Sequence, residues 1–170
     1  MRAWHFVGAD RRLRYGDGAT VAPGYVYTWD GPLALCQSGL HASVRAIDAL
    51  RYAPGPIVCR VEMGGEIVRG DDNVVAQSRE VLWAADATDA LRRFARLCAL
   101  DVTHLWNAPA VVLRYLRTGD ESIRAAAWDA ASNAAGAPAR AAARAAAWNA
   151  AWNAQSNRLH RMLMDLGRTA

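Results

Sequence analysis

The feature that most constrains this fold is a change of hydrophobic period near residue 84. Before it, short stretches rich in β-branched and aromatic residues alternate with glycine and proline, which is typical of strands and turns. These stretches are Ala3–Val7, Tyr25–Trp29, Ile57–Met63 and Val74–Trp83. After Trp83 the apolar residues recur at helical spacing. The change predicts an α+β chain with a β-rich domain over residues 1–84 and a helical region over residues 85–170, packed on that domain or forming an assembly arm.

Two local patterns refine the β-rich part, which we expect to be a small mixed or antiparallel sheet. Ser43 precedes a short apolar face that ends before Pro54, so we expect one inserted helix with Ser43 as its N-cap. The glycine pair Gly64–Gly65 predicts a tight hairpin between Ile57–Met63 and a short strand over Glu66–Arg69.

The C-terminal region predicts four helices, and much of it is alanine. The expected helices are Ala87–Leu105, Ala108–Arg117, Glu121–Ala135 and Pro138–Leu166. Residues 125–154 form an alanine-rich segment close to low complexity. Because alanine has the highest helix propensity, this segment should be helical.

The fourth of these helices has two distinct faces at about 100° per residue. One is an apolar stripe: Trp148, Trp152, Leu159, Met162, Leu163 and Leu166. A strip of arginines lies beside it: Arg140, Arg144, Arg158 and Arg161. The stripe either packs against the rest of the fold or docks a partner, since Trp, Met and Arg anchor interfaces.

Composition excludes several classes. The chain has 170 residues, of which 53% are apolar, too many for a disordered protein. No apolar run could span a bilayer and the start lacks a signal-type apolar segment, so we expect a cytoplasmic protein without membrane contact. Three scattered cysteines indicate free thiols. Phosphate-loop, zinc-ligand and nucleophile-elbow spacings are missing, so we expect no metal.

Charge gives weak support for a nucleic-acid partner. The chain carries twenty arginines and no lysine, with a net charge of +4. Residues 101–170 hold 8 arginines against 5 acidic residues. A solvated face accounts for such a surplus, and binding to DNA or RNA should be weak and sensitive to salt.

The most specific segment runs from Cys36 to Ser43, with the sequence CQSGLHAS. Gly39 permits a backbone geometry closed to other residues, and His41 follows it just before the expected helix. We therefore take Gly39, His41, Ser43 and Tyr52 as candidate ligand-binding residues. The alternative is that His41 holds the corner by hydrogen bonds.

Several blocks of the chain together resemble an uncharacterised family associated with phages and prophages. The blocks are AWHFV, CQSGLHAS…ALRYAPGPIVCRVE, ALRRFARLCAL…HLW and an Ala/Trp/Arg-rich helical tail. The resemblance implies a phage-related setting, either the host cytoplasm or the virion, and no particular chemistry.

Residues 39–63 also resemble part of the ADP-ribosyltransferase fold. There a short segment lies beneath the nicotinamide of NAD, and the following helix and strand complete the cleft. The resemblance implies His5 as a ribose contact, His41 as the stacking residue and Glu80 as the catalytic glutamate, with NAD as cofactor.

The sequence favours a phage- or prophage-type accessory protein that binds a protein partner or itself and has neither catalytic activity nor a cofactor. Alanine-rich helices approach one another closely, so packing through residues 125–135 could form a homo-oligomer. The alternatives are the NAD-binding enzyme and a nucleic-acid-binding protein. Convergence of His5, His41 and Glu80 on one cleft would favour the enzyme.

Overall fold

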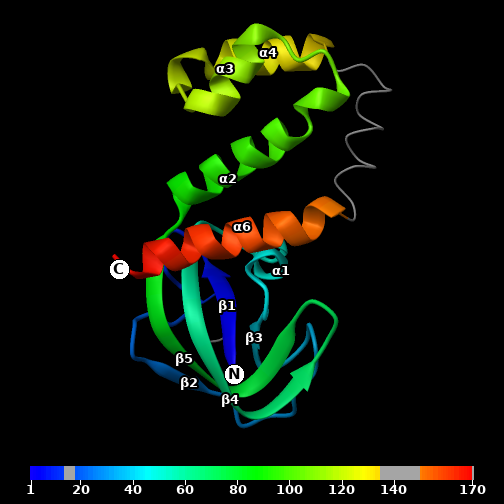
Figure 1. Ribbon diagram of the computed structural model, residues 1–170. Helices are drawn as coiled ribbons and strands as arrows, with labels where there is room; N and C mark the ends of the chain where they lie inside the picture. The colour runs from blue at the N-terminus through cyan, green and yellow to red at the C-terminus, as the bar shows by residue number, and fades with distance from the viewer. Residues whose placement is uncertain (14–17, 135–149, 170) are drawn as a thin grey trace. The chain divides into compact units, whose positions relative to one another are not determined.

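The computed structural model describes residues 1–13, 18–134 and 150–169, and it is an α+β protein, as the sequence predicts (Figure 1). The chain divides into two compact units. The sheet unit comprises Met1–Asp89 and Leu159–Ala170, and the helical unit comprises Ala90–Arg158. The helical unit is therefore inserted, in sequence, between two segments of the sheet unit.

The sheet unit contains one antiparallel sheet and one inserted helix. Its strands are β1 (Arg2–Val7), β2 (Val26–Thr28), β3 (Leu40–Ala42), β4 (Ile57–Arg69) and β5 (Val74–Asp86), and its helix is α1 (Ala46–Arg51). The strand order is β1-β4-β5-β2, and β3 also pairs with β5. Three of the four expected strands appear close to their predicted limits, because the strand pattern in the sequence is strong there.

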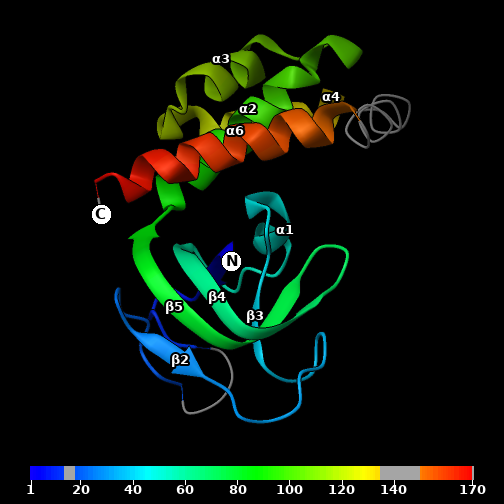
Figure 2. The ribbon, with the colours of Figure 1, turned by 60° about the horizontal axis from the view of Figure 1, so that its bottom comes forward.

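The sheet curls until it closes on itself (Figure 2). β1 pairs with β4 on one side, and the backbone of Trp4 pairs with that of Ser43, just after β3, on the other. The two bonds of this bridge measure 2.7 and 2.9 Å. Because β3 itself pairs with β5, a continuous ring of hydrogen-bonded strands surrounds the core. Closure leaves few unpaired backbone groups at sheet edges.

The predicted hairpin at Gly64–Gly65 is wrong, because β4 runs without interruption from Ile57 to Arg69. Gly65 adopts φ +70, and the register between β4 and β5 shifts between Gly64 and Ile67. The glycine therefore forms a β-bulge that bends the strand, and the chain turns later, at residues 70–73. A glycine pair inside a long strand gives the same sequence signal as a turn.

Ser43 does not cap the inserted helix as predicted. α1 begins at Ala46 with Arg45 in the cap position, and no side chain caps it. Ser43 is 2% exposed and uses its backbone in the bridge to Trp4. The pairing partner, Trp4, is 39 positions away in sequence, so local pattern could not reveal this role or the short strand β3.

The two faces of the sheet bury different residues. The enclosed face holds a core cluster that includes Ala3, Val7, Cys59, Val61 and Met63. On the other face, Trp4 contacts Trp83 edge to face, with ring centroids 5.8 Å apart.

The end of helix α6 (Ala150–Gly167) belongs to the sheet unit. His160 packs edge to face on Trp4 at 5.4 Å, and Leu159 and Leu163 are completely buried. Gly167 lies so close to the indole of Trp83 that a β-carbon there would overlap it. The last residues of the chain therefore complete the fold of the first ninety.

The helical unit contains short helices that bury few side chains. They are α2 (Thr88–Asp101), η1 (Thr103–Leu105), α3 (Ala110–Thr118), η2 (Glu121–Ile123) and α4 (Arg124–Ala134), close to the predicted limits. Asp120 begins η2 by accepting a hydrogen bond from the Ser122 amide at 3.0 Å, and Gly119 ends α3 at φ +69. In these five helices the buried apolar residues are Phe94, Val112 and Ala127.

Candidate functional site

A polar cluster lies on the enclosed face of the curled sheet. His5 of β1 pairs in register with Cys59 of β4, and Arg79 of β5 pairs with both Met63 and Tyr27. Residues directly opposite in an antiparallel sheet share a face, and so do Cys59 and Met63, four positions apart on one strand. The strands therefore bring His5, Cys59, Arg79 and Tyr27 together inside the sheet.

Arg79 is the most unusual member of this cluster, because its charge is buried without an acidic partner. The side chain is 3% exposed. Its Nη1 donates to the backbone carbonyl of His41 at 2.8 Å, and its guanidinium carbon lies 5.7 Å from the Tyr27 ring centroid. Its Nε is buried without a hydrogen-bond partner. Within the described part of the chain no aspartate or glutamate forms an ion pair with Arg79.

Burial and the charge of Arg79 determine the protonation of its neighbours. Burial lowers the pKa of Arg79 itself to about 10, so the guanidinium stays charged at neutral pH. Burial, then the charge of Arg79, then His41 hold the pKa of His5 well below its ordinary value, so His5 is neutral. Burial raises the pKa of Cys59 to about 11, so this thiol stays protonated and unreactive. Arg79 carries the charge of the cluster.

His41 holds the loop before β3 by hydrogen bonds. The amide of Cys36 donates to His41 Nε2 at 2.9 Å, which leaves Nδ1 as the protonated nitrogen, 3.1 Å from the carbonyl of Gly39. Gly39 adopts φ +102, the geometry that the sequence predicts for it, with Val75 and Leu33 against its α-carbon. Both ring nitrogens of His41 are therefore engaged with the backbone of its own loop.

The sheet does not bring Glu80 together with His5. Glu80 pairs in register with Glu62, and Glu62 pairs with Arg2. Arg2 and His5 are three positions apart on a regular strand, so they project from opposite faces. Glu80 consequently lies on the face opposite to His5, and these two residues do not converge on one cleft.

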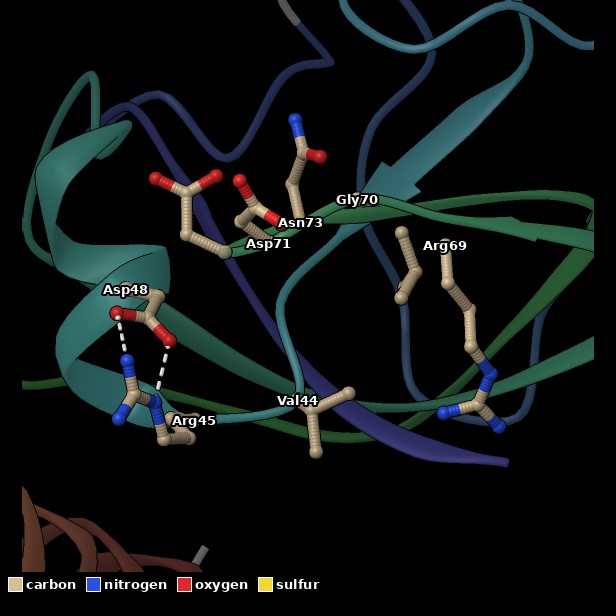
Figure 3. A pocket seen from close by; sticks show the side chains of 9 residues that line it. Val44, Arg45, Asp48, Arg69, Gly70, Asp71 and Asn73 are labelled. Carbon is tan, nitrogen blue, oxygen red and sulfur yellow. Dashed lines mark hydrogen bonds and ion pairs between the residues drawn. The ribbon is translucent and has the colours of Figure 1, made fainter.

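A pocket of about 230 Å³ lies next to the CQSGLHAS segment, between α1 and the turn after β4 (Figure 3). On the α1 side of the pocket, Arg45 and the buried Asp48 pair with each other through bonds of 2.6 and 3.0 Å. Asp72 accepts hydrogen bonds from Tyr52 at 2.9 Å and from Arg51 at 3.1 Å. The candidate residue Tyr52 is 50% exposed, and its hydroxyl bonds to Asp72, one of the residues that line the pocket. Of the five charged residues that line this pocket, Arg45 and Asp48 neutralise each other, and Asp72 pairs with Arg51, which is not part of the lining.

The candidate interaction residues of the last helix have different surroundings. Leu159 and Leu163 pack inside the sheet unit, and Trp152 is partly buried. Arg158 forms an ion pair with Asp101 at 2.7 Å, and Arg161 is exposed. Trp148, Arg140 and Arg144 lie outside the described residues.

One exposed tryptophan, on α4, is not predicted from the sequence. Trp128 is 74% exposed, although α4 buries Ala127 next to it. The signal was the AAAW unit at residues 125–128, but a tryptophan among alanines at helical spacing more often marks a core position than an exposed one.

The described residues contain neither a helix able to cross a membrane nor a group of three or more His, Cys, Asp or Glu suited to hold a metal ion. The three cysteines are free thiols.

By architecture, residues 1–89 form a small antiparallel sheet closed around a buried arginine, with one inserted helix. The chain belongs to the DUF7666 family, described as a domain of unknown function, whose model matches residues 1–93. That match spans the strands and the start of α2. No curated protein and no solved structure is significantly similar to the chain.

Proposed function

We propose that this chain is a binding protein without catalytic activity that associates with a second copy of itself through α4. The proposal rests on one observation: a large aromatic side chain, Trp128, is 74% exposed on a helix otherwise made mostly of small residues. Tryptophan is the residue type most enriched at the energetic centres of protein interfaces.

We take as the contact face of α4 five of its eight exposed residues; the other three are Ala126, Asn133 and Ala134. At about 100° per residue, its five members fall within an arc of about 140°, opposite the buried Ala127. All five are exposed: Arg124, Ala125, Trp128, Asp129 and Ser132. The face therefore consists of one large apolar residue, two small residues and one charge of each sign.

This face is complementary to itself. In an antiparallel pair of α4 helices with a two-fold axis near residues 126 and 127, Arg124 of one copy lies opposite Asp129 of the other. Trp128 then lies opposite Ala125 of the second copy, whose small side chain leaves room for the indole. A two-fold interface repeats each such contact twice. Self-complementary charge and shape favour a second copy over an unrelated partner.

The expected association is weak. α4 has 11 residues and is about 16 Å long, so its face is smaller than the roughly 800 Å² per partner of a standard interface. Sedimentation equilibrium at micromolar to millimolar protein should therefore show a reversible monomer–dimer equilibrium. Trp128→Ala should abolish the dimer, whereas Trp29→Ala, which removes an exposed tryptophan of the sheet unit, should not.

Charge exchange tests the antiparallel geometry. Asp129→Arg and Arg124→Asp should each weaken the dimer, because each places like charges opposite one another, and the double variant should restore it. A chain that stays monomeric throughout, or a dimer insensitive to Trp128→Ala, would refute self-association and leave a different protein as the partner of this face.

The setting belongs to the same proposal. The likeness of the GLHAS…YAPG block and the alanine-rich tail to phage- and prophage-associated proteins supports an accessory role of that type, in the host cytoplasm or as part of a virion. Tagged chain followed during induction of a lysogen that encodes it would test the setting, and purified virions that contain the chain would indicate the virion role.

A further inference from the structure

The helices α2 and α3 carry more positive charge than the acidic residues around them neutralise. Three arginines of the helical unit are paired, at 2.7, 3.7 and 3.4 Å: Arg158 with Asp101, Arg114 with Asp120 and Arg124 with Glu121. Four more arginines lie on α2 and α3: Arg92, Arg93, Arg96 and Arg117. Within the described part of the chain, none of these four forms an ion pair or a side-chain hydrogen bond.

The three unpaired arginines of α2 lie on one side of that helix. At about 100° per residue they fall within an arc of about 100°, with Arg96 between Arg92 and Arg93. Phe94, the buried residue of α2, lies on the opposite side. Arg92 and Arg93 are exposed, so their charges are open to a partner from solution.

Arg96 connects this side of α2 with the end of α3. Its guanidinium lies against Gly119, which ends α3 at φ +69, so closely that a β-carbon on that glycine would come within 2.5 Å of the guanidinium carbon. Arg117 is exposed and lies two residues before this glycine, a stretch of chain that spans at most about 7 Å. The four arginines therefore form one positively charged region, which we call the arginine face.

The apolar side chains of the two helices decide which class of partner fits this face. α2 and α3 are described in full, and neither exposes a large apolar side chain. The face therefore offers no anchor for a protein interface and none for insertion between lipids. It also lacks an exposed aromatic ring on which unpaired bases could stack. Charge is what it presents, and the phosphates of a nucleic-acid duplex can be held by charge alone.

We propose that the arginine face binds the phosphate backbone of a nucleic-acid duplex without reading its sequence. Arg92 and Arg96 are about 6 Å apart along the helix axis, so they can contact different phosphates. The forked guanidinium matches two phosphate oxygens. The arginine face shares no residue with the contact face of α4, so either proposal can fail without the other.

The test measures binding of fluorescent DNA and RNA duplexes of scrambled sequence to the full chain by anisotropy, and the tighter of the two identifies the nucleic acid. With four phosphate contacts, affinity for the DNA duplex should fall about a hundredfold between about 50 and 200 mM salt, a slope of about −3.6 on logarithmic axes. Arg92→Gln and Arg117→Gln should each reduce this slope by about one. The matched control is Arg69→Gln, which removes an exposed and unpaired arginine of the sheet unit and should leave the slope unchanged.

Asp89 provides a variant that should strengthen binding, an effect that misfolding would not produce. Asp89 is exposed and lies in the same arc of α2, where its carboxylate repels phosphates. Asp89→Asn should therefore tighten duplex binding about threefold at low salt. Polyglutamate serves as the competing polyanion, and we expect it to bind more weakly than the duplex. No duplex binding at about 50 mM salt, or a slope that the arginine variants leave unchanged, would overturn the proposal. Tighter binding of polyglutamate would also overturn it, in favour of an acidic protein segment.

Discussion

The sheet unit and the helical unit of this chain achieve stability by opposite routes. The sheet unit buries a contiguous core between strands far apart in sequence: β1 pairs with β4, which is 50 to 60 residues away, and Leu159 and Leu163 come from the end of α6. The helical unit relies on neighbouring helices, caps and helix propensity, and it leaves Trp128 exposed. A region built from local contacts can change its surface residues freely, because few of them hold the fold together. This difference is the reason that we propose the self-association face on the helical unit and not on the sheet unit.

The largest expected effect comes from removing residues 159–170. The truncated chain loses two fully buried leucines and uncovers Trp4, so we expect it to lose on the order of 5 kcal/mol, about the whole stability of a small domain. Amide dispersion of β1, β4 and β5 in NMR spectra checks this. Native dispersion in the truncated chain would show that the sheet unit is as locally stabilised as the helical one.

A matched pair of leucine substitutions compares the two cores directly. Leu163→Ala should lower the free energy of unfolding by about 3 kcal/mol, because the site is completely buried. Leu116→Ala on α3, where the side chain is only partly buried, should cost about 1 kcal/mol. Denaturant unfolding, monitored by hydrogen exchange in each unit, measures both losses of stability. Equal losses would contradict the difference between the two cores.

The pH dependence of stability should come partly from the sheet interior. Folding holds the pKa of His5 well below its ordinary value, so below about pH 6.5 the unfolded chain takes up a proton that the folded chain cannot. Stability should then fall with decreasing pH by up to about 1.4 kcal/mol per pH unit until the folded histidine titrates. His5→Gln should flatten the urea midpoint between pH 6.5 and 5, and an unchanged slope would assign the loss to other groups.

The smallest predicted effects on stability concern two glycines with left-handed backbone geometry, one in each unit. Gly65 forms the bulge of β4 at φ +70, and Gly119 ends α3 at φ +69. Alanine at either position should cost about 1 kcal/mol from backbone strain. Gly65→Ala should cost slightly more, because its β-carbon meets Cβ of Gln77 at 2.9 Å, whereas the neighbour at Gly119 is the flexible end of Arg96. Thermal melts of both variants measure which substitution lowers the melting temperature more.

Sequence patterns predicted what depends on neighbours in the chain and missed what depends on distant ones. The helices α2 and α3 followed from apolar spacing. The bulge at Gly65 was mistaken for a turn, because only the register with β5 distinguishes the two. Ser43 was given a helix cap, because its real partner, Trp4, lies in another strand.

The same limit applies to the sites. The residue pattern of β5 does not show which face of the sheet Arg79 occupies. An arginine in a strand is ordinarily exposed to solvent. Its burial follows from closure of the sheet, a tertiary property. The sequence pattern drew attention to His41, but only the structure shows that its ring is engaged by its own loop.

The order of the segments along the chain has a consequence for synthesis. The ribosome releases residues 1–89 first, then the helical insert, and last the dozen residues that cover Trp4. The insert can fold while translation continues, because its contacts are local. The sheet cannot cover Trp4 and Trp83 until residues 159–170 leave the exit tunnel. A nascent chain that exposes apolar surface for this long is a natural client for chaperones, and folding yield should depend on how quickly residues 90–170 are translated.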